Sequence, residues 1–151
     1  MSKKRERISQ KALIHSSLGE FSQGDKNHPP RFLKGGHGEE NIRELKKRGI
    51  QYHIVEQYPN GVRLGNVPSH KQAQKRLGGG QTWFPKSWTR NTIKKAGEKT
   101  INSIDYKLPD GMNMFGTYKK VKVVVKRTNG KPATIFPYYK QSGRKQKWIG
   151  K

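Results

Sequence analysis

The chain contains no cysteine, few acidic residues and no long hydrophobic run among its 151 residues. The absence of cysteine excludes disulfides, thiolate nucleophiles and zinc sites with cysteine ligands. No apolar run is longer than the valines at 123–125, whereas a membrane-spanning helix needs about 20 apolar residues. A transmembrane protein is therefore excluded, and the length favours one modest domain.

Acidic residues are scarce: 10 Asp and Glu stand against 33 Lys and Arg, and the net charge is +23. So many positive charges repel one another, and a protein tolerates this repulsion when its partner is a polyanion. Eleven basic residues and no acidic residue follow Asp110. A solubilising surface mixes both signs, whereas phosphate contacts need cations without acids. The charge therefore favours nucleic-acid binding over binding of a heparin-like or membrane polyanion.

Low hydrophobicity with high net charge is typical of disordered chains, but the Trp, Tyr and Phe content (3, 6 and 5) favours a folded core. The ends lack hydrophobic periodicity. We expect a flexible N-terminal segment over 1–11, one domain over 12–140 and a basic tail over 141–151. Two hairpin-bearing halves favour subdomains of about 12–80 and 81–140.

Hydrophobic periodicity and turn residues predict alternating helices and hairpins. Helices are predicted up to about Ile14, over 39–48, over 69–77, and from a cap at Ser87 or Thr89 to about Ile104. Strands are predicted over 51–57, 62–67, 118–127 and 133–139, and the stretch 16–38 is predicted as irregular loop. Lysines alternate with valines in 118–127, which predicts a row of ammonium groups on one sheet face. The fold class is α+β, with antiparallel sheets and packed helices.

Charge does not separate an RNA-binding protein from a nuclease, but histidines do. Metal-free cleavage of RNA needs a general base for the 2′-OH, a general acid for the 5′-oxygen and a cation for the phosphorane. Two histidines and a lysine meet this demand. A metal-dependent enzyme needs clustered carboxylates, and the sequence has no DxD or HExxH motif. The stretch 37–40 (HGEE) lacks a convincing metal-ligand spacing.

Three motifs occur in order along the chain. His15 is followed by Gly19-Glu20 and then by 35–37 (GGH); the segment 82–89 (TWFPKSWT) leads into a helix; and 134–138 (TIFPY) ends the last strand. Together they resemble the EndoU ribonuclease family, with its His-x-x-x-Gly-Glu, Gly-x-His and Ser/Thr-Phe-Phe-Pro segments. The stretches 35–41 (GGHGEEN) and 60–68 (NGVRLGNVP) resemble toxin domains of contact-dependent inhibition (CdiA-type) proteins.

The resemblance implies a two-subdomain nuclease that cleaves RNA by transphosphorylation, without a metal or other cofactor. The products are a 2′,3′-cyclic phosphate and a 5′-OH. His15 and His37 match the catalytic histidines, with acid and base roles in either order. Lys75 is the candidate third member of the triad, with Lys71 and then Lys86 as alternatives.

The resemblance also implies substrate-binding residues. Thr82 matches the Ser/Thr that lines the base pocket. Phe136 stands where the family usually has tyrosine, so Tyr138 or Tyr139 would supply the phenolic hydrogen bond, and no uridine preference follows. The candidate substrate-binding set is Thr82, Tyr138, Lys71 and Thr134.

Other histidines and aromatic residues have structural interpretations. His28 precedes two prolines and is expected at a loop tip, whereas His53 and His70 suit structural or phosphate-facing roles. The aromatic side chains of 83–88 are expected in the core rather than as base platforms.

The likeness to toxins implies interbacterial competition, with delivery as part of a larger secreted or cell-surface effector. The domain would act on RNA, with tRNA expected, in the target-cell cytoplasm. An acidic immunity protein would neutralise it, and no membrane integration is expected. The rival hypothesis is a non-catalytic, ribosomal-type RNA-binding protein, which accounts for the charge but not for the histidine motifs.

Overall fold

The computed structural model of the chain describes residues 5–147. This range contains three α-helices, α1 (Gln10–Ser17), α2 (Glu39–Lys47) and α3 (Arg90–Ile101), and a 3-10 turn at Ala73–Lys75. The strands are β1 (Glu20–Ser22), β2 (Arg31–Lys34), β3 (His53–Gln57), β4 (Arg63–Asn66), β5 (Gln81–Trp83), β6 (Met114–Tyr118), β7 (Val121–Thr128), β8 (Lys131–Pro137) and β9 (Gln146–Lys147). All strand pairs are antiparallel, which confirms the predicted α+β class.

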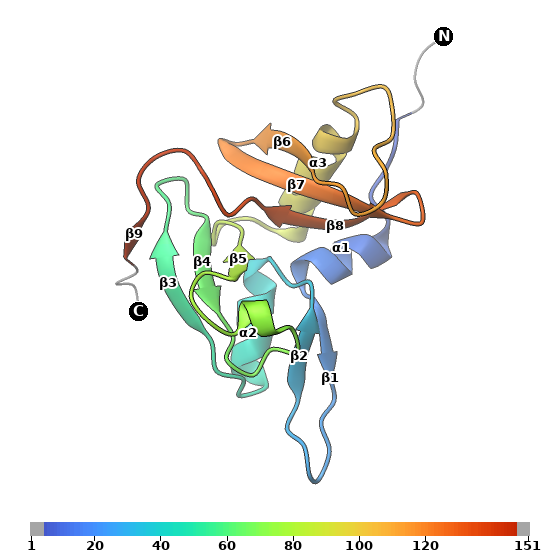
Figure 1. The fold of residues 1–151 in the computed structure, drawn as a ribbon. Helices are drawn as coiled ribbons and strands as arrows, with labels where there is room; N and C mark the ends of the chain where they lie inside the picture. Colours follow the sequence, from blue (N-terminus) through green and yellow to red (C-terminus); the bar gives the residue numbers. More distant parts are fainter. Residues whose placement is uncertain (1–4, 148–151) are drawn as a thin grey trace.

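The strands form three sheets: the hairpin β1–β2, a sheet in the order β5-β4-β3-β9, and a sheet in the order β6-β7-β8. In Figure 1, the β6-β7-β8 sheet and α3 lie in the upper half of the molecule, and β3, β4, β5 and α2 lie below them. Helix α1 packs against β8 and α3, and β5 contacts β8. The two larger sheets therefore meet along β5 and β8.

Two hydrophobic clusters underlie this arrangement. One joins α1 and α3 to the β6-β7-β8 sheet and includes Phe84, Trp88 and Ile93. The other joins α2 to β2 and β5 and includes Phe32 and Trp83. The adjacent residues Trp83 and Phe84 thus enter different clusters, and the prediction that these aromatic side chains belong to the core is confirmed.

Two of the predicted helices have the ends that their residues dictate. Helix α2 has acidic residues in its first turn, lysines in its last, and Gly49 with a positive φ after its end. Thr89 caps α3, because its hydroxyl accepts a hydrogen bond from the Thr92 amide. Within the described residues, no helix combines the length and hydrophobicity that crossing a bilayer requires.

The prediction of irregular loop over 16–38 is wrong. Strands β1 and β2 pair within it, with Phe21 opposite Phe32 and their rings stacked at 5.1 Å. Each strand is only three or four residues long, so neither displays a period. Asp25 closes the connecting turn by accepting hydrogen bonds from the amides of Asn27 and His28.

The prediction of a helix over 69–77 is also wrong, since only the turn Ala73–Lys75 is helical there. Leu77 is exposed, so a helix would have no apolar face to bury. Instead, Arg76 binds the backbone by donating from Nε to the His70 carbonyl at 2.6 Å. In contrast, the first helix continues beyond Ile14 to Ser17.

The predicted C-terminal hairpin is confirmed as β7 and β8, and an additional strand, β6, pairs with β7. Strand β7 begins at Val121, because Lys119 and Lys120 adopt positive φ angles and form a turn. The chain before this turn forms β6, which lengthens the hairpin into a three-stranded sheet. Residues 102–113 show no hydrophobic periodicity, so the sequence does not indicate where β6 begins.

The described parts of both predicted terminal segments contact the domain. Arg127 pairs with Glu6 at 2.6 Å, and the Ile8 amide donates to Glu98 at 3.0 Å. In the basic tail, β9 pairs with β3. Residues 1–4 and 148–151 of these segments lie outside the described residues, and the proposed subdomain boundary near residue 80 stays a prediction.

Candidate active site

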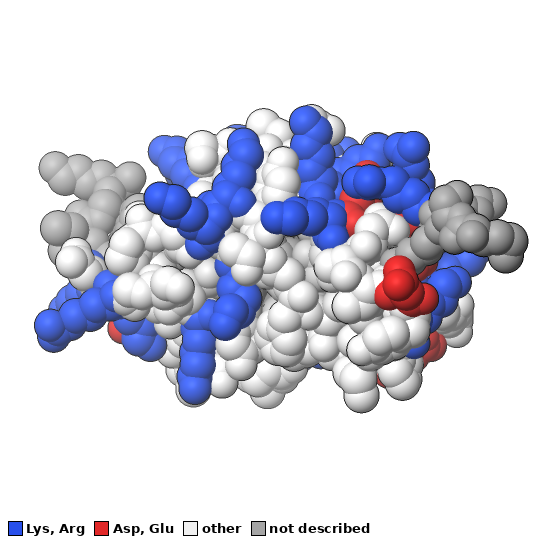
Figure 2. Space-filling model, turned by 90° about the horizontal axis from the view of Figure 1, so that it is seen from above, with Lys and Arg blue, Asp and Glu red and all other residues white. Residues whose placement is uncertain are grey.

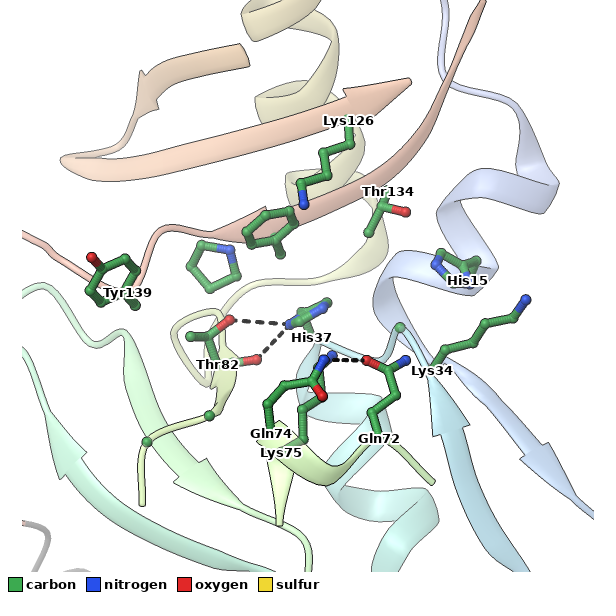
Figure 3. A pocket seen from close by; sticks show the side chains of 15 residues that line it. His15, Lys34, His37, Gln72, Gln74, Lys75, Thr82, Lys126, Thr134 and Tyr139 are labelled. Carbon is green, nitrogen blue, oxygen red and sulfur yellow. Dashed lines mark hydrogen bonds between the residues drawn. The ribbon is translucent and has the colours of Figure 1, made fainter. Parts of the chain in front are cut away.

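A pocket of about 590 Å³ lies where α1, the loop before α2, and the strands β5, β7 and β8 meet. It gathers five of the predicted site residues: His15, His37, Lys75, Thr82 and Thr134. Figure 3 shows His37 between Thr134, which comes from β8, and Lys75 on the opposite side. The pocket thus combines segments that lie up to 124 residues apart, from His15 to Tyr139.

Other predicted residues do not line this pocket. Lys71 and Lys86 are exposed and lie outside its lining, and Tyr138 packs beside it against Tyr139, with ring centroids 4.7 Å apart. The lining residues that were not among the predicted site residues include Lys34, Gln72, Gln74, Lys126, Phe136 and Tyr139. The strand pattern predicts a row of lysines on β7 but carries no signal that one of them reaches a pocket.

His15 is positioned by the end of α1. Gly19 follows the helix with φ of +88° and turns the chain back, so that Glu20 lies beside the last helical turn. The distance between Nδ1 of His15 and Oε2 of Glu20 is 2.6 Å. Because a carboxylate can only accept, Nδ1 donates the hydrogen bond. The neutral ring therefore carries its lone pair on Nε2.

The loop that carries His37 runs against the end of α1. The Gly36 amide donates to the His15 carbonyl at 2.9 Å, and the His37 amide donates to the Ser16 carbonyl at 2.6 Å. Gly35 has φ of +71°, and a Cβ there would overlap the carbonyl oxygen of His15. Glycine before His37 is thus required for the two catalytic candidates to approach one another.

His37 is held as a neutral ring. Its Nδ1 lies 2.7 Å from the Thr82 carbonyl oxygen, which can only accept, so Nδ1 carries the proton. Burial lowers the pKa of His37 well below 6.5, and the positive charge of Lys75 lowers it further. The side chain is only 5% exposed, and Nε2 has no hydrogen-bond partner among the described residues. A neutral imidazole with a free Nε2 is suited to accept a proton.

The pocket is positively charged. Lys34, Lys75 and Lys126 line it, and its lining includes no Asp or Glu. Burial, and then the charge of Lys126, lowers the pKa of Lys75 to about 8. Lys75 therefore remains largely protonated at pH 7, yet its ammonium group is partly desolvated. Such a group interacts strongly with a phosphate that enters the pocket.

Part of the pocket wall is suited to a nucleobase. The rings of His37 and Phe136 lie 5.6 Å apart, and Lys126 Nζ lies 5.7 Å from the Phe136 ring centroid. The hydroxyl of Thr82 lies 3.3 Å from Nδ1 of His37. The phenol that lines the pocket is Tyr139 rather than Tyr138. Aromatic and hydroxyl groups at these positions allow stacking and hydrogen bonding with a base.

The remaining histidines lie elsewhere. His28 is exposed at the tip of the β1–β2 hairpin, with its ring beside Asp25. The His53 ring contacts Asn66 at 3.0 Å. His70 is buried against Phe32, and burial lowers its pKa to about 4. None of the three lines the pocket.

An ion pair between β4 and α2 supports the loop of His37. Arg63 donates to Glu39 at 2.7 Å and to the Phe84 carbonyl at 2.6 Å, while the Phe84 amide donates to the His37 carbonyl at 2.7 Å. The Arg63 side chain is 4% exposed and that of Glu39 12%. Arg63 thus connects the first residue of α2 to Phe84, the residue that follows β5 and binds the backbone of His37.

Arg63→Ala is expected to lower the free energy of unfolding by about 3–5 kcal/mol, because it leaves Glu39 as a nearly buried charge without its partner. Urea denaturation of wild type and variant measures this difference. Arg43→Ala, at an exposed position of α2, is the matched control and should have almost no effect. Equal stability of the Arg63 and Arg43 variants would contradict the structural role of the ion pair.

Comparison with known proteins identifies the family of this chain. A family model described as bacterial EndoU nuclease matches residues 9–139, which include every predicted site residue. No curated protein and no solved structure matches the chain. Within residues 5–147, no three His, Asp or Glu side chains gather as a group that could hold a metal ion.

Proposed function

The chain belongs to the bacterial EndoU nuclease family, which makes it an endoribonuclease, and we propose that it cleaves RNA without a metal ion, at the pocket of His15, His37 and Lys75. The reaction is a transphosphorylation within the RNA strand. The ribose 2′-oxygen forms a bond to the adjacent phosphorus, and the bond from phosphorus to the 5′-oxygen breaks. The products are a 2′,3′-cyclic phosphate and a 5′-OH.

His37 acts as the general base. Its neutral state and its free Nε2 support this role, since the 2′-OH must lose a proton as it attacks. His15 acts as the general acid and gives a proton from Nε2 to the leaving 5′-oxygen. The carboxylate of Glu20 supports this role, because it forms an ion pair with the protonated ring. The proton taken by His37 returns to solvent after the products leave.

Lys75 stabilises the negative charge that develops on the phosphorane. The observation that carries the proposal is that His15, His37 and Lys75 surround one pocket whose lining includes no carboxylate. Lys71 and Lys86 are exposed and lie outside the lining, which favours Lys75 as the third member of the triad. Lys71 is then left with a contact to the RNA backbone.

The base before the cleaved bond contacts the part of the pocket wall that contains Thr82, Thr134 and Phe136. Phe136 offers a face for stacking but no hydroxyl, so hydrogen bonds to the base come from Thr82, Thr134 or Tyr139. A site without tyrosine at position 136 is expected to discriminate less between pyrimidines than one with it.

We further propose that the domain acts as a toxin in interbacterial competition. It is delivered as part of a larger secreted or cell-surface effector and cleaves tRNA in the cytoplasm of the target cell. In Figure 2, Lys and Arg side chains are spread over the face in view, and acidic side chains are few. The net charge of +23 favours an acidic immunity protein that covers the pocket in the producing cell.

Incubation of the protein with total RNA in EDTA tests the proposed reaction. We expect cleavage products that end in a 2′,3′-cyclic phosphate and a 5′-OH, with EDTA having no effect. The same gel shows whether tRNA is cleaved in preference to other RNA. Binding of RNA without any cleavage would instead support the rival function of a ribosomal-type RNA-binding protein.

A further inference from the structure

The face of the β6-β7-β8 sheet that lies opposite α3 carries aromatic side chains. Val121, Val123 and Val125 point to the core that contains α3, so the residues between them on β7 occupy the other face. The strand register places Phe115 and Phe136 on either side of Val124. Phe115 therefore shares a sheet face with the aromatic residue of the pocket.

Three aromatic side chains form a continuous cluster on this side of the molecule. The rings of Phe115 and Tyr138 meet edge to face at 5.0 Å, and those of Tyr138 and Tyr139 lie 4.7 Å apart. Phe115 is 49% exposed and Tyr139 is 51% exposed. Because Tyr139 also lines the pocket, this aromatic platform of Phe115, Tyr138 and Tyr139 starts at the active site and leads away from it.

Lysines accompany the platform. Lys122 Nζ lies 5.7 Å from the ring centroid of Tyr138, and Lys140 Nζ lies 5.6 Å from that of Tyr139. Neither lysine forms an ion pair with a carboxylate in the part of the chain that the structure describes. The platform therefore presents exposed aromatic rings beside cations that are free to bind phosphate.

The combination points to one kind of occupant. Exposed aromatic clusters on a soluble protein indicate an interaction surface. Single-stranded RNA offers unstacked bases for the rings and phosphates for the lysines, whereas the bases of a duplex are already stacked. The acidic groups of a protein partner would match the lysines, but the series of exposed rings that leads from the pocket matches the unstacked bases of a strand held there.

We propose that the aromatic platform binds a nucleotide of single-stranded RNA next to the cleaved step, so that the enzyme selects unpaired segments longer than a dinucleotide. This inference rests on the proposed function of the pocket. Phe115 is the sharpest test of it, because its side chain has no polar group, lies outside the pocket lining and is half exposed.

The test compares Phe115→Ala, Phe115→Leu and Phe115→Trp on two substrates, a dinucleotide and a single-stranded nonamer that contains the same step. We expect kcat/KM for the nonamer to fall about tenfold to hundredfold in the Ala and Leu variants. The Trp variant should retain the wild-type value, since it keeps a stacking face. The dinucleotide, which is too short to reach Phe115, should be cleaved at the wild-type rate by all three.

Tyr106→Ala is the matched control, because Tyr106 is an exposed aromatic residue outside the platform, and neither substrate should be affected. Binding of a nonamer with 2′-deoxyribose at the cleaved step gives a readout independent of catalysis, and Phe115→Ala should weaken it by a similar factor.

Three results separate the possible failures. Unchanged binding and cleavage of the nonamer by Phe115→Ala would overturn the platform and leave this surface to a protein partner. An equal loss on both substrates would also overturn it, since it would indicate a structural role. Failure of the wild-type protein to cleave either substrate would refute the proposed function instead.

Discussion

His15→Ala and His37→Ala are each expected to reduce kcat for RNA cleavage by about 10²–10⁴-fold, the range that positioned acid or base catalysts contribute. In the wild-type protein, Nδ1 of each ring is held by an acceptor, Glu20 for His15 and the Thr82 carbonyl for His37. Alanine removes the proton carrier at Nε2 in both cases. Single-turnover cleavage of a labelled RNA oligonucleotide measures the effect on the chemical step.

The loss should be specific to these two rings. His28→Ala and His53→Ala make the same chemical change outside the pocket and should leave kcat within about twofold of wild type. RNA affinity should remain nearly unchanged in the His15 and His37 variants. The acid–base assignment is wrong if both variants still cleave at the wild-type rate.

Lys75→Ala is expected to lower kcat by about 10²–10³-fold, the typical loss when one group that stabilises the transition-state charge is removed. Lys75 is the half-buried lysine of the 3-10 turn, and its charge acts in a partly desolvated pocket. Lys71→Ala and Lys86→Ala are the matched controls, because both residues lie outside the lining. A larger loss in either control than in Lys75→Ala would reassign the third member of the triad.

The pH profile gives this prediction a second readout. Lys75 is charged below its pKa of about 8 and neutral above it, so kcat/KM should fall as the pH rises through about 8. Lys75→Arg keeps the charge at higher pH, and its alkaline limb should move upward even if its rate is lower. His37 must be neutral to act as a base. Because its pKa lies well below 6.5, activity should persist on the acid side of pH 6.5.

The sequence motifs led to the histidines because these motifs describe local geometry. Gly19 and Gly35 adopt backbone conformations that other residues rarely adopt, and both lie where the end of α1 and the loop of His37 touch. A glycine pattern around two histidines therefore reports a close backbone approach. The same pattern is silent on the hydrogen bond between His37 and Thr82, which joins residues 45 positions apart.

Which of the candidate lysines and candidate base-binding residues line the pocket was harder to predict from sequence. Lys71 and Lys75 are four residues apart in a segment that was predicted to be helical, and only its actual course directs Lys75 into the pocket. Tyr138 and Tyr139 are neighbours that follow β8, and their rings pack together at 4.7 Å, yet only Tyr139 lines the pocket. Neither residue belongs to a strand, so no strand period predicts which of the two side chains reaches the pocket.

The sequence alone determined the charge, the α+β class, the ends of α2 and the two hairpins, because these depend on composition and on residues close together in the chain. The structure decided between Ser87 and Thr89 as the cap of α3, and it decided the pairing of β1 with β2, the presence of β6, and the positions of Tyr139, Lys126 and Lys75 in one pocket lining. Apart from the cap, these features depend on contacts between segments that are far apart in the chain, and local sequence patterns do not predict such contacts. The charge of +23 indicated a polyanion, whereas the burial that lowers the pKa of His37 exists only once the segments meet.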